Sequence, residues 1–359
     1  MSQRPKPLVS ALLAVALPAL VALVALVTFA APVPRARAQE ISRKERAAFL
    51  VPERDSLKPI KSADRYLRSN ETELQVFGPH IDDLGGGYVG VGADQNYTLA
   101  AMAKSRFVWL MDYDPWVVTL HRIYRALILE SDSPAAFVTR WGNQTEVQAL
   151  LGKHYNGDPD LKDMLEIYRR YRRFLQPYLG WSLKRKRGGA GTTWLSSSVM
   201  YDRVRAMWRE GRFQPVPGDL HGERVFQGIS RAARRLGVPM RIVYLSNAEM
   251  YLPYSKAFVA NMKSVPSDAR SLLVRTVRHD RYPMLGDKWH YNVQPFSDDY
   301  LRRLESGRYH RIYNMMEDFL RSPRAVQQKT MTPRGFSRFS REVPTFDELL
   351  QRARERRRP

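Results

Sequence analysis

Residues 85–114 read GGGYVGVGADQNYTLAAMAKSRFVWLMDYD, and this stretch predicts the fold class of the chain. Its opening run of Tyr and Val favours a strand, and Gly90 and Gly92 stand where a backbone without Cβ can turn tightly beside a ligand. The segment Thr98–Lys104 suits a short helix, and the apolar run Phe107–Met111 is typical of a buried parallel strand. The stretch therefore predicts a strand–helix–strand unit.

Acidic residues follow the second of these strands, at the edge where open α/β sheets bind their ligands. Asp112 lies 20 positions after Gly92, and an acid at this spacing can accept hydrogen bonds from ribose hydroxyls. A dinucleotide site needs a third glycine, but Gln95 stands in its place. Asp94 would repel a pyrophosphate, whereas it could accept a hydrogen bond from the amino group of an amino-acid-like ligand. The pattern thus favours a small-molecule ligand without phosphates.

Further strands and helices alternate along the rest of the chain. An extended segment at Arg212–Asp219 precedes a helix at His221–Leu236, which has one apolar face. Strands follow at Met240–Leu245, Ser271–Val277 and Trp289–Phe296. This order predicts an α/β protein with a doubly wound, Rossmann-like sheet.

A long, mostly helical insertion separates the second strand from the third, at about residues 115–210. Its helices are expected at Trp116–Leu129 and Leu161–Leu175, each with an apolar stripe for the core. The stripe of the second helix includes Phe174, and its arginines form either a solvated face or a surface for nucleic acid or anionic lipid. The basic, glycine-rich run at 184–191 is interpreted as a lid over the cleft, a surface loop or a docking arm.

Three motifs, G-x-G-x-D-Q-N-Y-T, P-G-D-L-x-G and Y-L-S-N-A-E, occur in this order along the chain. Together they resemble an uncharacterised family of bacterial proteins whose Rossmann-like domain is similar to class I S-adenosylmethionine-dependent methyltransferases, many of them exported or lipid-anchored. The resemblance covers roughly residues 85–296 and implies S-adenosylmethionine as cofactor, with Asp112 in the place of the acid that holds the adenosyl ribose. The cofactor-binding residues that it implies are Gly90, Gly92, Asp94, Gln95, Asn96, Asp112 and Asp219.

The segment Tyr244–Tyr251 stands where methyltransferases place the strand-end motif that faces the transferred methyl group. The resemblance implies that Asn247 or Glu249 is the catalytic residue, because a side chain there orients or deprotonates the nucleophile. The prolines that follow this motif in amine-methylating members are absent, which argues against an amine acceptor.

Two functions therefore stay open. The first is a methyltransferase whose methyl acceptor the sequence does not reveal. The second is an exported, catalytically inactive Rossmann-like protein with a binding or structural role in the bacterial envelope. A hydrolase is a weaker alternative because G-x-S-x-G is absent.

The amino-terminal residues predict export or membrane anchoring. Leu8–Ala31 is an apolar stretch, and Ala36-Arg37-Ala38 is an A-x-A cleavage site. Residues 1–38 are thus a signal peptide, or a membrane anchor if cleavage fails, and the protein is exported to the periplasm or exterior or anchored by residues 8–31. A polar linker at 39–70, the methyltransferase-like domain at 71–325 and a basic tail at 326–359 complete the predicted organisation.

The amino-acid composition limits the kinds of binding partner that we expect. The chain has 58 Lys and Arg against 36 Asp and Glu, a net charge of +22, which favours contact with an anionic membrane or cell-wall surface. No specific nucleic-acid-binding motif occurs, and the histidines lack metal-ligand spacing. The absence of cysteine excludes disulfides, thiolate metal sites and a lipoprotein anchor. The sequence carries no prediction of oligomeric state.

Overall fold

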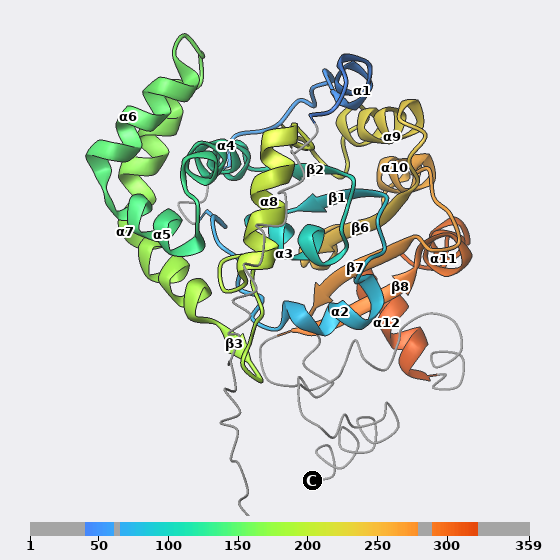
Figure 1. The fold of residues 1–359 in the computed structure, drawn as a ribbon. Coiled ribbons are helices and arrows are strands. Elements are labelled where there is room, and N and C mark those ends of the chain that lie inside the picture. Colours follow the sequence, from blue (N-terminus) through green and yellow to red (C-terminus); the bar gives the residue numbers. More distant parts are fainter. Residues whose placement is uncertain (1–39, 61–64, 279–288, 322–359) are drawn as a thin grey trace, which may run out of the picture. The chain divides into compact units, whose positions relative to one another are not determined.

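The structure is a computed structural model that describes residues 40–60, 65–278 and 289–321 (Figure 1). The chain divides into two compact units, Met1–Arg37 and Ala38–Pro359, and all described residues belong to the second. The apolar stretch at 8–31 and the basic tail at 326–359 lie outside the described residues. Within the described part of the chain, no helix is both long and apolar enough to cross a membrane.

A six-stranded sheet forms the centre of the described unit, in the order β5-β2-β1-β6-β7-β8. Five strands are parallel, and β8 pairs antiparallel with β7. Counted along the chain, the six strands have the doubly wound order 3-2-1-4-5-6. The predicted α/β fold is confirmed, and the mixed, mostly parallel sheet is broadly Rossmann-like. The strands are β1 Gly87–Val91, β2 Phe107–Asp112, β5 Phe213–Pro217, β6 Met240–Ser246, β7 Leu272–Val277 and β8 His290–Pro295.

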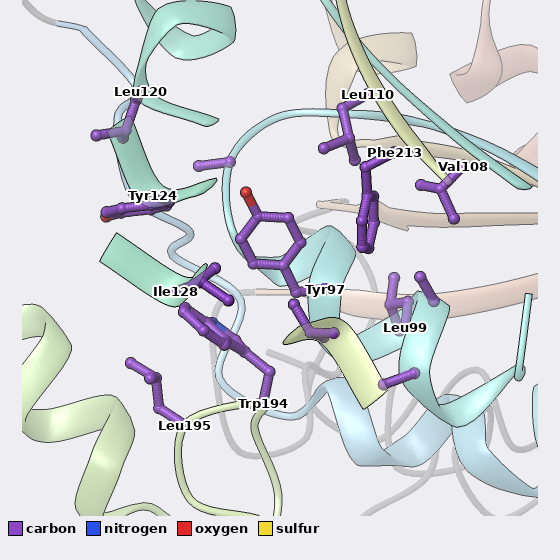
Figure 2. Packing of buried hydrophobic residues seen from close by; sticks show 14 of the residues in the cluster. Tyr97, Leu99, Val108, Leu110, Leu120, Tyr124, Ile128, Trp194, Leu195 and Phe213 are labelled. Atoms are coloured by element: carbon purple, nitrogen blue, oxygen red, sulfur yellow. The ribbon is translucent and has the colours of Figure 1, made fainter. Parts of the chain in front are cut away.

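Helices cover both faces of this sheet, so its strands alternate between two buried clusters. Tyr88 of β1 and Leu110 of β2 belong to the first cluster, while their neighbours Val89 and Trp109 belong to the second. The first cluster is covered by α3 Gln95–Met102, α4 Pro115–Glu130 and α8 Ser198–Glu210; the second by α1 Arg43–Phe49, α9 Val225–Arg235 and α10 Lys256–Ser264. In the first, Tyr97 of α3 lies among the aromatic rings of Tyr124, Trp194 and Phe213 (Figure 2).

The prolines of β5 fit its position at the edge of the sheet. Pro215 and Pro217 cannot donate a backbone hydrogen bond, so a strand that contains them fits at an edge. In agreement, among the strands that the structure describes, β5 pairs with β2 alone.

The predicted helical insertion is confirmed, because helices α4 to α8 lie between β2 and β5. Asp114 caps α4 by accepting from the Trp116 N–H, and Pro115 takes the first helical position. Helices α5, α6 and α7 pack together beside α4 (Figure 1). The further elements are α5 Pro134–Gly142, α6 Gln144–Tyr155, α7 Leu161–Lys184, the hairpin strands β3 Lys186–Arg187 and β4 Ala190–Gly191, α2 Gly78–Ile81, α11 Arg302–Glu305 and α12 Ile312–Arg321.

One residue of the predicted core stripe in α7 is exposed. The Phe174 side chain is 44% exposed and lies under the guanidinium of Arg68, 4.6 Å from its ring centroid. Its position on the helix turns it to the same side as exposed Arg170 and Trp181, so this part of the stripe forms surface and not core.

The segment 39–70, predicted as a polar linker, contains α1 and several apolar contacts to the sheet. Ser42 and Glu45 form a capping box at the start of α1. Phe49 is buried against the rings of Phe107 and Trp109, and the indole N–H of Trp109 donates to the Phe49 carbonyl. These contacts attach the residues around α1 to the second cluster.

Candidate ligand-binding cleft

A cavity of about 450 Å³ lies at the carboxyl ends of β1, β2, β5 and β6. Strand β1 is flanked by β2 on one side and β6 on the other, so the cavity lies at the topological switch point of the sheet. This is where doubly wound folds bind ligands, and the volume suits a small organic molecule.

The turn after β1 is built around Gly92 and Asp112. Gly92 has φ +94°, which is a left-handed conformation that favours glycine. One carboxylate oxygen of Asp112 accepts from the Gly92 N–H at 2.9 Å, and the other accepts from the Asp114 N–H at 2.8 Å. The glycine turn and the strand-end acid therefore lie next to each other, as expected, and a hydrogen bond joins them.

Burial shifts the pKa of two groups that are hydrogen-bonded to this turn. It raises the pKa of Asp112 to about 6, although backbone N–H donors from Asp114 and Gly92 partly oppose the shift. It lowers the pKa of His121 to about 4. His121 Nε2 donates to the Gly92 carbonyl at 3.0 Å, so Nδ1 is left to accept from the Tyr97 hydroxyl at 2.8 Å. The imidazole is thus neutral near pH 7.

Five of the nine sequence-predicted site residues line the cavity. They are Gly92, Gln95, Asp112, Asp219 and Asn247. They come from the carboxyl ends of β1, β2, β5 and β6, or directly follow them. Their contact with a ligand stays a prediction, but their convergence on one cavity is a property of the structure.

The other four predicted residues do not line the cavity. Asp94 is buried. It accepts from the Tyr178 hydroxyl and the Trp194 indole N–H, both at 2.8 Å. Both donors belong to the helical insertion. A Cβ on Gly90 would lie 2.1 Å from Oδ1 of Asn96, so this glycine makes room for packing. The amide of Asn96 donates to three carbonyls of the turn, at residues 91–93, and its Oδ1 accepts from a tyrosine hydroxyl.

Glu249 is the fourth of these residues. It forms a fully buried ion pair with Arg275 at 3.0 Å and accepts from the hydroxyls of Tyr254 and Tyr300. Of the two catalytic candidates, only Asn247 lies on the cavity wall.

The segment 65–71 contributes residues that the sequence did not single out. Arg65 pairs with Asp114 at 2.9 Å, and residues 66 and 68–71 line the cavity. This segment therefore forms one wall of the site. No local pattern marks it, because its partners lie far away in the sequence.

Glu71 is the buried acid of this wall. Its carboxylate accepts from four hydroxyl groups: Ser69, Tyr244, Ser246 and Thr276 at 2.6–2.9 Å. Ser246 ends β6 with φ +49°, an unusual conformation for a non-glycine residue, and in this conformation its hydroxyl lies 2.9 Å from the carboxylate. Glu71 thereby joins the ends of β6 and β7 to the cavity.

The cavity wall is acidic although the chain is strongly basic. Glu71, Asp112 and Asp219 line it, against the guanidinium of Arg68 and the imidazole of His221. The whole chain carries a net charge of +22. Among the described residues, no three His, Asp or Glu side chains group in a way that could hold a metal ion.

Comparison with known protein families assigns the chain to one of them. The family described as a domain of unknown function (DUF7790) matches residues 66–340, more than half of the chain. The chain belongs to the DUF7790 family. The DUF7790 match begins at residue 66 and so includes the cavity-lining residues 66 and 68–71. No curated protein matches the chain.

Proposed function

We propose that this DUF7790 domain binds S-adenosylmethionine in the switch-point cavity and transfers its methyl group. The observation that carries the proposal is the Asp112 carboxylate, which is held by the Gly92 N–H at the carboxyl end of β2. An ionised carboxylate has about four acceptor positions, so Asp112 can accept ribose hydroxyls while it keeps its two backbone donors.

The charge of the cavity supports a cationic ligand. Three carboxylates and one guanidinium line the wall. A pyrophosphate would meet repulsion from Glu71 and Asp112, whereas a sulfonium or an ammonium would be attracted. This favours an adenosyl amino acid over a dinucleotide or a nucleoside triphosphate.

Methyl transfer to a good nucleophile depends mainly on positioning. Asn247 follows β6 and lines the cavity, so it is the residue that we propose orients the acceptor. Glu249 is held by Arg275 and two tyrosines, and deprotonating an acceptor would require breaking that buried pair.

Calorimetry and thermal unfolding of the purified protein test ligand binding. Saturating S-adenosylmethionine should raise the unfolding temperature by several degrees, since a ligand at 100 times its Kd stabilises by about 2.7 kcal/mol. Asp112→Asn should lower the affinity at least about tenfold by removing a charged acceptor. Asp298→Asn, an exposed substitution, is the matched control. An absence of heat and of thermal shift at millimolar ligand would exclude the proposal.

Catalysis is tested separately from binding. Release of S-adenosylhomocysteine in the presence of envelope extract supports the methyltransferase, and Asn247→Ala should reduce that release without abolishing binding. Binding without any release would instead favour the inactive envelope protein.

A further inference from the structure

We propose that Glu71 and Gln95 form a subsite for an ammonium group at the amino-acid end of the ligand. This inference rests on the proposed function, because it assigns one part of an adenosyl amino acid to one part of the same cavity. It also replaces the expectation that Asp94 would hold that amino group.

Gln95 supplies an acceptor that has no partner among the residues that the structure describes. Its side chain is 5% exposed, it lines the cavity, and its Oε1 is buried without a hydrogen bond. None of the other described residues that line this cavity has such an unpaired buried side-chain atom. Buried polar atoms in folded proteins are nearly always paired, so the Gln95 amide lacks a donor that a ligand in the cavity can supply once the amide turns its oxygen toward it.

Glu71 supplies a negative charge that no described cation neutralises. All of its side-chain partners are neutral hydroxyl groups, and the residue is 5% exposed. Glu73, two positions away, is by contrast paired with Arg185 at 2.7 Å and with Arg187 at 3.2 Å. The four hydroxyl groups hold the Glu71 carboxylate in place and occupy its acceptor positions, so a ligand cation would be attracted by its charge and not by a further hydrogen bond.

The order of the strands separates this subsite from the expected ribose site by the width of β1. Asp112 ends β2, Gln95 follows the turn after β1, and Glu71 is bonded to Tyr244 and Ser246 of β6. Because β1 lies between β2 and β6, the two acids are separated by about two strand spacings, roughly 10 Å. A ligand whose ribose contacts Asp112 and whose 5′ substituent crosses β1 would bring that substituent to Gln95 and Glu71. In an adenosyl amino acid this substituent carries the ammonium.

Asp94 is unable to take this role in the structure. Its carboxylate accepts from Tyr178 and Trp194 of the insertion, and the residue does not line the cavity. The acid nearest in sequence to the glycine turn is thus directed into the insertion, while an acid from the segment 65–71 occupies the ligand side.

Two adenosine ligands separate the subsite from the rest of the cavity. S-adenosylhomocysteine carries the ammonium, whereas 5′-methylthioadenosine has the same adenosine and sulfur without the amino acid. Calorimetry with the purified protein should show that Glu71→Gln weakens S-adenosylhomocysteine about ten- to a hundredfold. Its effect on 5′-methylthioadenosine should stay within about twofold, because that ligand has no charge for Glu71 to bind.

Gln95→Met gives a second, independent variant that keeps the size of the side chain and removes the unpaired oxygen. It should weaken S-adenosylhomocysteine about three- to tenfold and leave 5′-methylthioadenosine within about twofold. Thermal unfolding verifies that each variant is folded, and Asp298→Asn controls for a remote loss of charge. If Glu71→Gln does not fold, Gln95→Met decides the question.

The outcomes distinguish the subsite from the proposed function. Equal weakening of both ligands, or no weakening of either, overturns the subsite while the adenosyl-binding cavity stands. Failure of the unchanged protein to bind either ligand overturns both proposals.

Discussion

At the scale of single residues, Gly92 connects two groups whose protonation affects stability in opposite directions. Asp112 accepts from its N–H, and His121 donates to its carbonyl. The pKa of Asp112 is raised from 3.8 to about 6, so the folded state holds its proton longer and stability falls as pH rises between these values. The pKa of His121 is lowered from 6.5 to about 4, so the unfolded state binds the extra proton and stability rises with pH over that window.

These opposite signs give a direct prediction. Between about pH 4.5 and 6.5, the free energy of unfolding of His121→Gln should fall relative to the unchanged protein, because the stabilising slope is removed. That of Asp112→Asn should rise over the same window, and each change should be at most about 2 kcal/mol. Urea unfolding at the two pH values measures both. Changes of the same sign in the two variants would contradict the assignment.

The site residues that sequence could predict are those whose role depends on nearby backbone. The Gly92–Asp112 spacing predicted a turn beside a strand-end acid, and the structure contains it. The direction of Asp94 was not predictable, since it depends on Tyr178 and Trp194, which lie 84 and 100 positions away. Glu71 gave no signal either, because its hydroxyl partner Thr276 lies 205 positions away.

At the scale of elements, Asp94 attaches the helical insertion to the start of α3. Asp94→Asn can still accept from one donor, but its NH₂ group would face the other, leaving a buried N–H or O–H unpaired. Urea unfolding should show a loss of about 1–3 kcal/mol. The affinity for S-adenosylhomocysteine should stay within about twofold, because Asp94 does not line the cavity. Asp163→Asn, exposed on α7, is the control, and a selective loss of affinity with unchanged stability would return Asp94 to the ligand site.

The six strands of the sheet and helices α3, α4, α7 and α9 were predictable from periodicity, whereas α1, α5, α6 and α8 were not singled out. The ends of the helices depended on distant contacts. Helix α9 was expected from His221 but begins at Val225. Asp55 accepts from the N–H groups of Arg224 and Val225 and so caps this helix from another part of the chain. Helix α7 continues past its expected end through Pro177, where the affected backbone lies on an exposed side and water can replace the missing hydrogen bond.

At the scale of the whole molecule, positive charge gathers on a surface that meets the acidic cavity at Arg68, which lines the cavity and covers the ring of Phe174. From Arg169 to Arg187, the end of α7 and the following hairpin contain eight Lys or Arg and no acid, and Trp181 and Phe174 are 40% and 44% exposed there. Exposed aromatic rings among basic residues are typical of a surface that binds an anionic membrane, whereas the acidic cavity would repel an anionic ligand. We therefore expect an anionic membrane to bind this basic surface and the small-molecule ligand to bind inside the cavity.

Vesicle flotation tests whether the basic surface of α7 binds the membrane. The protein should bind phosphatidylserine vesicles at low salt and be released at about 0.5 M salt, where charges are screened within a few ångströms. Reversing Arg169, Arg170 and Arg173 to Glu should weaken binding at least about tenfold, since each basic residue contributes about 1 kcal/mol at such a surface. Reversing the exposed Arg302, Arg308 and Arg311 changes the net charge equally and should have a smaller effect. Equal losses would assign the binding to net charge alone, because only a localised surface distinguishes two variants of the same total charge.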